Sequence, residues 1–500
     1  MALSNKSSVM AIKEESTEGV VVSPTAATDY VALQEGFSFE PSFQTLENKE
    51  LKGSIGKAKT LLGQEQPKAS FDHYLRASGV EGQAPNYRLL LKSALGQETV
   101  NSTEYPTVAA STINQIKVNT GIGANFKRGQ ALLIKDGTNG YSVRNVLSVS
   151  GDNLNTSFDL AVAPAAAVNL GKCIAYAPLN QGHPTLSVWE YRGNGGAVEL
   201  MSGSRVTEAS WDFQAGQFIS GKFSLDGVEY FYNPMNVVST TSKLDWLDNA
   251  TTRVATIPQK IYKDPADLAS AIQTAMQSQS ANTITVTYIS STGKFKITSS
   301  GTTLSLLWNT GANKVNSIGA LIGANMSADQ TGALTYTLVN AINLASPYTP
   351  SLDVADPVVA KDNEVLMGDV SDFQKLHPSR VSVQLSNSRK QISDVTTLSG
   401  VSGSVLTGRE VTISFTALLD QYDVDKFKRF RTGQQTSFSY SAGLKSGGNW
   451  QAGKTVNAYV PTATITSFKL GDDDGLAILE CELKAFVDDS GNGEFYLNFL

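Results

Sequence analysis

Cysteine and histidine are scarce: the 500 residues include two of the former and three of the latter. Cys173 and Cys481 lie far apart in the chain, which excludes a disulfide framework and favours two small buried hydrophobic residues. The histidines are isolated, with no second His or Cys at metal-ligand spacing. We therefore expect neither a metal site nor a cofactor.

Long apolar runs are also missing. No stretch of about 18 apolar residues exists that could span a membrane, and residues 1–16 lack the apolar core of a signal peptide. Charged residues make up 17% of the chain and the net charge is −6, so there is no overall basic footprint for nucleic acid. We expect a protein that is made in, and soluble in, a cytoplasm and has no membrane partner.

Catalytic signatures are absent as well. The sequence contains no GxSxG, HExxH or Walker motif. Residues 193–196 (GNGG) follow a strand pattern but open no helix, so they do not form a phosphate cradle. The acidic run 472–474 is interpreted as a solvated hairpin turn, since a calcium loop needs alternating ligands. The sequence thus predicts a protein that is not an enzyme.

Alternating strands are what the chain does contain. Residues 206–225 (VTEASWDFQAGQFISGKFSL) predict two strands around a turn, because a period of two marks half-buried strands. Residues 463–483 (ATITSFKLGDDDGLAILECEL) repeat that pattern. Aligning the two Ser-aromatic pairs matches Ser210-Trp211 with Ser467-Phe468.

Five landmarks occur twice in the same order, which predicts an internal duplication. A strand FSFEPS or VSVQLS comes first, followed by a loose arm ending in a strand with Ser70-Phe71 or Ser414-Phe415. A helix ending at Gly96 or Gly433 follows, then a strand SVWEYRG or SFSYSAG. The hairpin comes last and ends near YFY or FYL.

Two segments interrupt this repeat. Residues 98–181 read as short strands between tight turns and predict an all-β module. Residues 235–345 begin with a helix over 264–279, capped by Asp264 with Pro265 at its first position, and continue as strands. We expect a mainly β fold: a first domain formed by 1–97 and 182–234, these two inserted modules (one all-β, one α+β), and a second domain over 346–500, each main domain carrying one short helix.

The order strand, long arm, strand, helix, strand, hairpin resembles the tail tube proteins of long, non-contractile-tailed bacteriophages (siphophages). The stretch 267–311 is also similar to a small module of phage virion proteins. The resemblance implies β-sandwich domains whose inner sheets join into a barrel around a lumen, in rings that stack into a tail. It also implies self-assembly within the virion, tape measure and tail terminator or tip proteins as partners, and DNA that passes through the lumen without sequence-specific binding.

Tubes of this family commonly present six tube folds per ring. With two per chain, we expect a homotrimeric ring of pseudo-sixfold symmetry; a homohexamer is the alternative. The arms 45–67 and 388–405 are expected to contact the adjacent ring, through Lys49, Lys52, Lys57, Lys59, Arg389 and Lys390. The inner-sheet hairpins are expected to carry Trp211, Phe213, Phe223, Phe468, Leu470 and Leu483.

A rival interpretation is a phage or bacterial surface adhesin whose inserted β modules bind a glycan or receptor. It accounts for the modules but not for the duplicated arm, strand and helix. A carbohydrate-cleaving enzyme is a more distant alternative, because no paired carboxylates stand out.

Overall fold

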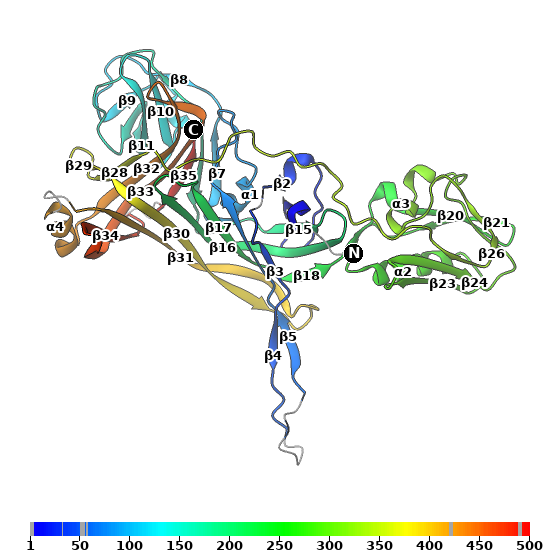
Figure 1. The fold of residues 1–500 in the computed structure, drawn as a ribbon. Helices are drawn as coiled ribbons and strands as arrows, with labels where there is room; N and C mark the ends of the chain where they lie inside the picture. The colour runs from blue at the N-terminus through cyan, green and yellow to red at the C-terminus, as the bar shows by residue number, and fades with distance from the viewer. Residues whose placement is uncertain (1–4, 33, 51–55, 57–58, 420–423, 489–492) are drawn as a thin grey trace.

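The computed structural model describes residues 5–32, 34–50, 56, 59–419, 424–488 and 493–500. The fold is mainly β: one large sheet system forms the body, a narrow hairpin projects from it, and two smaller modules lie at its sides (Figure 1). The predicted fold class is confirmed in this respect.

The first unit of the body is a two-layered arrangement of strands with one helix. The long strand β16 (Ala197–Gln214) belongs to both layers: its first half pairs with β15 and β18, and its second half pairs with β17. The other elements are β1 (Val9–Glu14), β2 (Tyr30–Val31), β3 (Ser38–Glu40), β6 (Lys68–Tyr74), α1 (Arg88–Leu95), β15 (Leu186–Arg192), β17 (Ser220–Asp226) and β18 (Glu229–Tyr232).

The second unit is built in the same way around β33 (Asn449–Asp473), which pairs with β32 and β35 in its first part and β34 in its last. Its other elements are β28 (Glu364–Gly368), β29 (Phe373–Leu376), β30 (Pro378–Ser393), β31 (Val401–Leu418), α4 (Val424–Thr432), β32 (Thr436–Ser446), β34 (Leu476–Ala485) and β35 (Tyr496–Phe499).

The strand pairings of the two units correspond one to one. The first unit contains β1–β2, β1–β15, β15–β16, β16–β17, β16–β18, β3–β6 and β6–β17. The second contains β28–β29, β28–β32, β32–β33, β33–β34, β33–β35, β30–β31 and β31–β34. The two units therefore have the same strand connection pattern.

β-Bulges fix the residue equivalence between the units, because an extra residue pins the register of a ladder. The β16–β17 ladder shifts between Val206 and Glu208, and the β33–β34 ladder shifts between Ile465 and Ser467. Val206 thus corresponds to Ile465, and Trp211 corresponds to Leu470. The alignment expected from the Ser-aromatic pairs is wrong by two residues in this hairpin, since Phe468 occupies the place of Ala209.

The two helices end as their sequences predict. At the end of α1 the backbone of Gly96 has a φ of 104°, and Gly433 after α4 has a φ of 65°, a region that favours glycine. Leu90, Leu91 and Leu95 of α1 are completely buried against the body.

The β module is a six-stranded sheet in the order β8-β13-β10-β11-β12-β9. It is fastened to the second unit by buried amides: Asn145 Nδ2 donates to Asn457 Oδ1 at 2.7 Å. The flanking strands β7 (Gly96–Asn101) and β14 (Cys173–Pro178) pair with each other, and β14 also pairs with β35 of the body. The module's strands are β8 (Tyr105–Pro106), β9 (Gln115–Lys117), β10 (Ala131–Asp136), β11 (Gly140–Ser150), β12 (Asn153–Thr156) and β13 (Asn169–Leu170).

The α+β module lies to one side of the body and packs α2 (Pro265–Gln277) against two small sheets (Figure 1). The Asp264 carboxylate caps α2 by accepting hydrogen bonds from the N–H groups of Ala266 and Asp267. Trp246 and Trp308 are fully buried in its core. Its other elements are β19 (Met235–Asn236), β20 (Lys243–Asp248), β21 (Thr251–Thr256), β22 (Ile261–Tyr262), β23 (Ile284–Ile289), β24 (Lys294–Ser299), β25 (Leu304–Leu306), α3 (Gly319–Ile322), β26 (Gln330–Ala333) and β27 (Thr335–Thr337).

Candidate functional site

The two units join edge to edge through β16 and β30. Seven consecutive residue pairs link the strands antiparallel, from Glu208 opposite Ser386 to Gln214 opposite Arg380. Just beyond them the Ala215 N–H donates to Ser379 O at 2.9 Å. One layer is therefore a continuous sheet in the order β3-β6-β17-β16-β30-β31-β34-β33, which we call the inner sheet.

One face of the inner sheet is the core. Trp211 and Phe213 lie opposite Val383 and Val381 at the junction, and all four side chains are buried. The Phe213 ring lies 4.2 Å from that of Tyr440, centroid to centroid, so the first unit packs directly onto the second. Burial of aromatic side chains across this contact favours one fixed arrangement of the units.

The opposite face of the inner sheet is polar. Arg380 of β30 forms a bidentate pair with Asp212 of β16 (2.8 and 2.9 Å), and Gln384 Nε2 donates to Glu208 Oε1 at 2.7 Å. The Asp212 carboxylate raises the pKa of the Arg380 guanidinium, which is already charged at every relevant pH. These contacts help to set the register of the junction on its solvent side.

The predicted hairpin residues divide into two groups. Trp211, Phe213, Phe223 and Leu483 are buried in the core, where Phe223 stacks on His73. Phe468 is half-buried under α4, against the rings of Phe427 and Phe430. Leu470 is 58% exposed, although its counterpart Trp211 is 2% exposed. The difference arises because β16 is covered by β30, whereas among the described residues nothing pairs with residues 466–473 of β33 on the side away from β34.

The first arm is a two-stranded hairpin of β4 (Phe43–Leu46) and β5 (Leu61–Glu65) that projects far from the body (Figure 1). Lys49 and Lys59 are exposed on it, and Lys52 and Lys57 lie outside the described residues. The second arm is the distal half of the β30–β31 hairpin. Its tip contacts the base of the first arm, where the Glu65 N–H donates to Ser399 O at 3.0 Å.

Arg389 does not belong to the exposed surface of the second arm, contrary to expectation, whereas Lys390 next to it does. The Arg389 side chain is 2% exposed and donates hydrogen bonds to the backbone carbonyls of Asp226 and Gly203. Burial lowers the pKa of its guanidinium to about 10, still charged at neutral pH. A side chain enclosed by its own chain cannot reach an adjacent ring.

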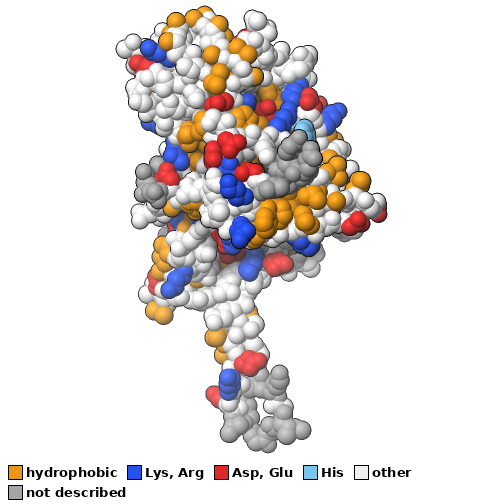
Figure 2. Space-filling model, turned by 90° about the vertical axis from the view of Figure 1, so that its left-hand side faces the viewer, with side chains coloured by type: hydrophobic (Ala, Val, Ile, Leu, Met, Phe, Trp, Pro, Cys, Tyr) orange, Lys and Arg blue, Asp and Glu red, His pale blue; other side chains and the backbone are white. Residues whose placement is uncertain are grey.

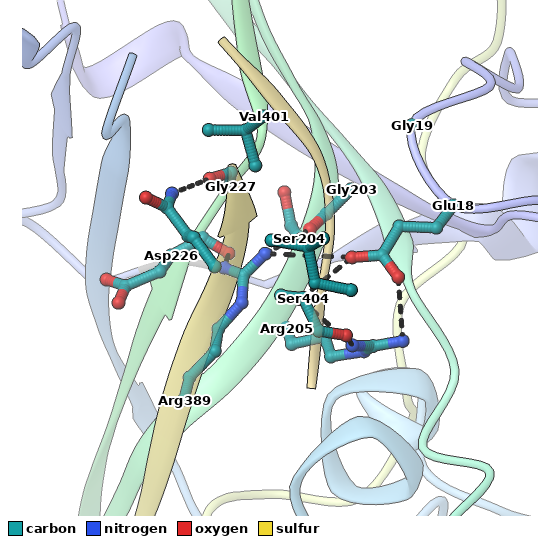
Figure 3. A network of polar contacts seen from close by, with 12 residues as sticks. Glu18, Gly19, Gly203, Ser204, Arg205, Asp226, Gly227, Arg389, Val401 and Ser404 are labelled. Atoms are coloured by element: carbon teal, nitrogen blue, oxygen red, sulfur yellow. Dashed lines mark hydrogen bonds and ion pairs between the residues drawn. The ribbon is translucent and has the colours of Figure 1, made fainter. Parts of the chain in front are cut away.

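Glu18 of the N-terminal segment supplies a carboxylate to the surroundings of Arg389, in addition to the nearby Asp226 (Figure 3). Its carboxylate accepts hydrogen bonds from Arg205 Nη2 at 3.0 Å and from Ser404 Oγ at 2.8 Å, and lies 3.9 Å from Arg389 Nη2. Three distant segments are thereby tied together: the N-terminal segment, β16 and the second arm. Sequence reasoning missed Glu18 and Arg205, because a lone charged residue gives no local signal of a partner far along the chain.

Other kinds of site find little support in the described part of the chain. No group of three or more His, Cys, Asp or Glu there could hold a metal ion. No described helix is long and apolar enough to cross a membrane. Cys173 and Cys481 are both buried, and burial raises the pKa of the Cys173 thiol to about 12.

Comparison with known proteins gives a family match for the first part of the chain. The model of the phage tail tube protein family matches residues 5–243, which span the first unit and the β module set within it. No curated protein matches the chain.

Several solved structures are similar over part of the chain. The sheath/tube terminator of an extracellular contractile injection system is 17% identical, with 27% of this chain and 95% of that chain covered and a TM-score of 0.22. The SPP1 tail tube is 13% identical, with 29% and 80% covered and a TM-score of 0.21. A native gene transfer agent virion gives 16% identity, 26% and 92% coverage and a TM-score of 0.18.

Proposed function

We propose that this chain, whose residues 5–243 match the model of the phage tail tube protein family, builds the tube with two tandem tube-type domains, so that three chains close one ring of pseudo-sixfold symmetry. The protein is a structural, non-enzymatic component of the virion tail that forms the tail tube. The number of chains per ring and the tandem arrangement are the new elements of the proposal.

One observation carries it: the β16–β30 junction joins two units of the same pairing pattern into one sheet. A strand edge that is left open invites another strand. If each contact between chains copies the contact within the chain, the subunits meet head to tail, and such contacts generate a ring when the rotation closes. Three chains then contribute six equivalent stretches of inner sheet.

The solvent face of the inner sheet suits a lumen through which DNA passes. Acidic side chains outnumber basic ones there, so phosphates are repelled rather than bound. By strand alternation this face carries Glu40, Asp72, Glu208, Asp212, Asp226, Glu410, Asp473, Glu480 and Glu482 against Lys68, Arg205, Lys222, Arg380, Lys469 and Lys484.

The first arm is assigned to the adjacent ring. Its hairpin carries Phe43, Leu46, Leu61 and Leu62 exposed beyond the body, and none of the four belongs to a core cluster of the described residues. We assign the inserted modules to the outside of the tube, because both are attached to the layer that does not include β30, β31 and β34. A siphophage tail, with tape measure and terminator or tip proteins as partners, is the setting that this assembly fits.

Removal of the first arm separates stacking from ring closure. Replacing residues 47–60 by a short Gly-Ser turn should leave folded protein that no longer forms tubes under negative-stain microscopy. The remaining rings should have three times the mass of one chain in native mass spectrometry. Tubes formed by the shortened variant would refute the role of the arm, and a mass of six chains would refute the three-chain ring.

A further inference from the structure

We propose that residues 467–473 of β33 pair antiparallel with residues 36–42 of a second copy of the chain, in the register that sets Leu470 opposite Phe39 and Lys469 opposite Glu40. This inference rests on the proposed function and gives the residues of the contact between chains.

The register comes from the junction inside the chain. There Trp211 lies opposite Val383, and Ser210 lies opposite Gln384. Trp211 corresponds to Leu470 through the matching bulges of β16 and β33. Val383 corresponds to Phe39, because Ser382 pairs with Ser414 as Ser38 pairs with Ser70. Replacing Trp211 by Leu470 and Val383 by Phe39 in the junction register gives the proposed pairs between the two outer edges.

Both edges are unpaired in the described chain. β3 pairs with β6 on one side only, and residues 466–473 pair with β34 on one side only. The Gln34 N–H donates to Asp72 O, and the Gln66 N–H donates to Ser42 O. Because strand residues alternate in direction, the polar backbone groups of residues 37 and 39 then point to the open side, where a second strand can satisfy them.

Apolar side chains gather at the second unit's open edge (Figure 2). Leu419 is 40% exposed, whereas its counterpart Leu75 is completely buried. The two are equivalent because the Leu75 N–H donates to Ile219 O and the Leu419 N–H to Ala477 O, both at 2.9 Å. Exposed members of the patch are Leu418, Leu419, Phe427, Leu470 and Leu476. The first-unit counterparts of Leu419 and Leu470 are buried, so the contact that covers them there is missing at this edge of the second unit until another chain supplies it.

Charge complementarity supports a second copy as the occupant. On the polar face Lys469 would lie directly opposite Glu40, which is exposed and acidic. In the monomer Lys469 pairs at 3.0 Å with Glu480, and both side chains are largely exposed, so the lysine can add a second acidic partner. Pro41 offers no N–H to the open side, which removes one hydrogen bond from the ladder and discourages other strands from pairing there.

A disulfide introduced across the edges tests the register. Ser42 and Ser467 would form a pair without backbone hydrogen bonds, with Cα atoms about 4.5 Å apart, within the range a disulfide bridges. The double variant Ser42→Cys/Ser467→Cys, assembled into tubes and oxidised, should give covalent multimers on non-reducing gels. The native thiols are buried and do not compete. Ser38→Cys/Ser467→Cys is the matched control, four residues out of register, and should remain monomeric.

A second pair guards against a variant that fails to assemble. Glu40→Cys/Lys469→Cys occupies the next position of the same kind and should cross-link equally well. Lys469→Glu should raise the protein concentration needed for assembly about two- to fivefold, the size of an exposed ion pair, and Glu40→Lys added to it should restore assembly.

The outcomes separate the inference from the proposal on which it rests. Tubes in which neither in-register pair cross-links, or in which the shifted control does, would overturn the register while leaving the tube function intact. A covalent series that ends at three chains supports both, and a series that continues to six supports the register but contradicts the three-chain ring. Wild-type protein that never forms rings or tubes would overturn the proposed ring and this contact with it.

Discussion

Glu18 offers a sharp test of how the second arm is held, because its carboxylate serves two arginines and a serine from separate segments (Figure 3). In Glu18→Gln the amide oxygen can keep one of these partners, but the negative charge is lost. Arg205 and the buried Arg389 then lose the carboxylate they share, and Asp226 and Glu15 remain as the negative charges near Arg389.

The expected cost follows from these contacts. Breaking a buried ion pair completely costs about 3–5 kcal/mol, but Arg389 retains the carbonyls of Asp226 and Gly203. Exchanging one charge-assisted hydrogen bond for a neutral one costs about 1 kcal/mol, and the weaker neutralisation of the two arginines adds a similar amount. We therefore expect a loss of about 2 kcal/mol in the local stability of the arm, or roughly 30-fold in its opening equilibrium.

Hydrogen exchange is the suitable assay, because a chain with several units is not expected to unfold in one step. Amides of Ser404, Val405 and Leu406, which face Gln391, Lys390 and Arg389 across the hairpin, should exchange about 30-fold faster in Glu18→Gln. Glu35→Gln is the matched control, since Glu35 pairs loosely with Lys6 at 3.7 Å on the surface. Unchanged exchange in Glu18→Gln, or equal acceleration in Glu35→Gln, would refute the reasoning.

Three further predictions concern the interior of the first unit. Gly221→Ala should destabilise it by about 1–3 kcal/mol, seen as a lower denaturation midpoint, because the new Cβ would lie 2.4 Å from His73 Cε1 and 2.8 Å from Trp211 Cδ1. Burial lowers the pKa of His73 to about 3, so below pH ~6.5 the unfolded chain binds a proton that the folded chain does not bind. The free energy of unfolding should therefore fall by up to about 1.4 kcal/mol per pH unit in that range. A His73→Phe variant whose pH profile matches that of the wild type would contradict this. Burial, partly offset by Arg192, raises the pKa of the Glu190 carboxyl. The stability that this group contributes is therefore present below the ordinary carboxyl pKa and is lost as the pH rises through the raised pKa. Glu190→Gln should stabilise the protein more at pH 8 than at pH 5, and an equal gain at both pH values would contradict this prediction.

The strands were predictable because alternation is a local property. Residues 37–42 and 381–386 show the same alternation of large apolar and small polar residues, and the structure places them at equivalent positions. The hairpin register was not predictable to better than two residues. A slip of two keeps every side chain on its own face, so a period of two cannot detect it; the bulges at Thr207 and Thr466 decide it.

Contacts between distant segments could not be predicted from the sequence. The alternation of β16 does not predict that β30 is its neighbour, because a strand pattern contains no information about which strand pairs with it. Arg389 looked like one more solvated charge in a loose arm, and only the folded chain brings Glu18, Gly203 and Asp226 around it. The exposure of Leu470 likewise depends on where the sheet stops, which the sequence does not mark.

The central claim is that each chain supplies two of the six tube-type domains in a ring. End-on averages and helical reconstruction of assembled wild-type tubes by electron microscopy test it most directly. The account predicts threefold rings with a pseudo-sixfold inner wall, in which alternate subunit positions differ by the module from residues 98–181 and the acidic turn at 472–474. True sixfold rings, with identical density at all six positions, would contradict it.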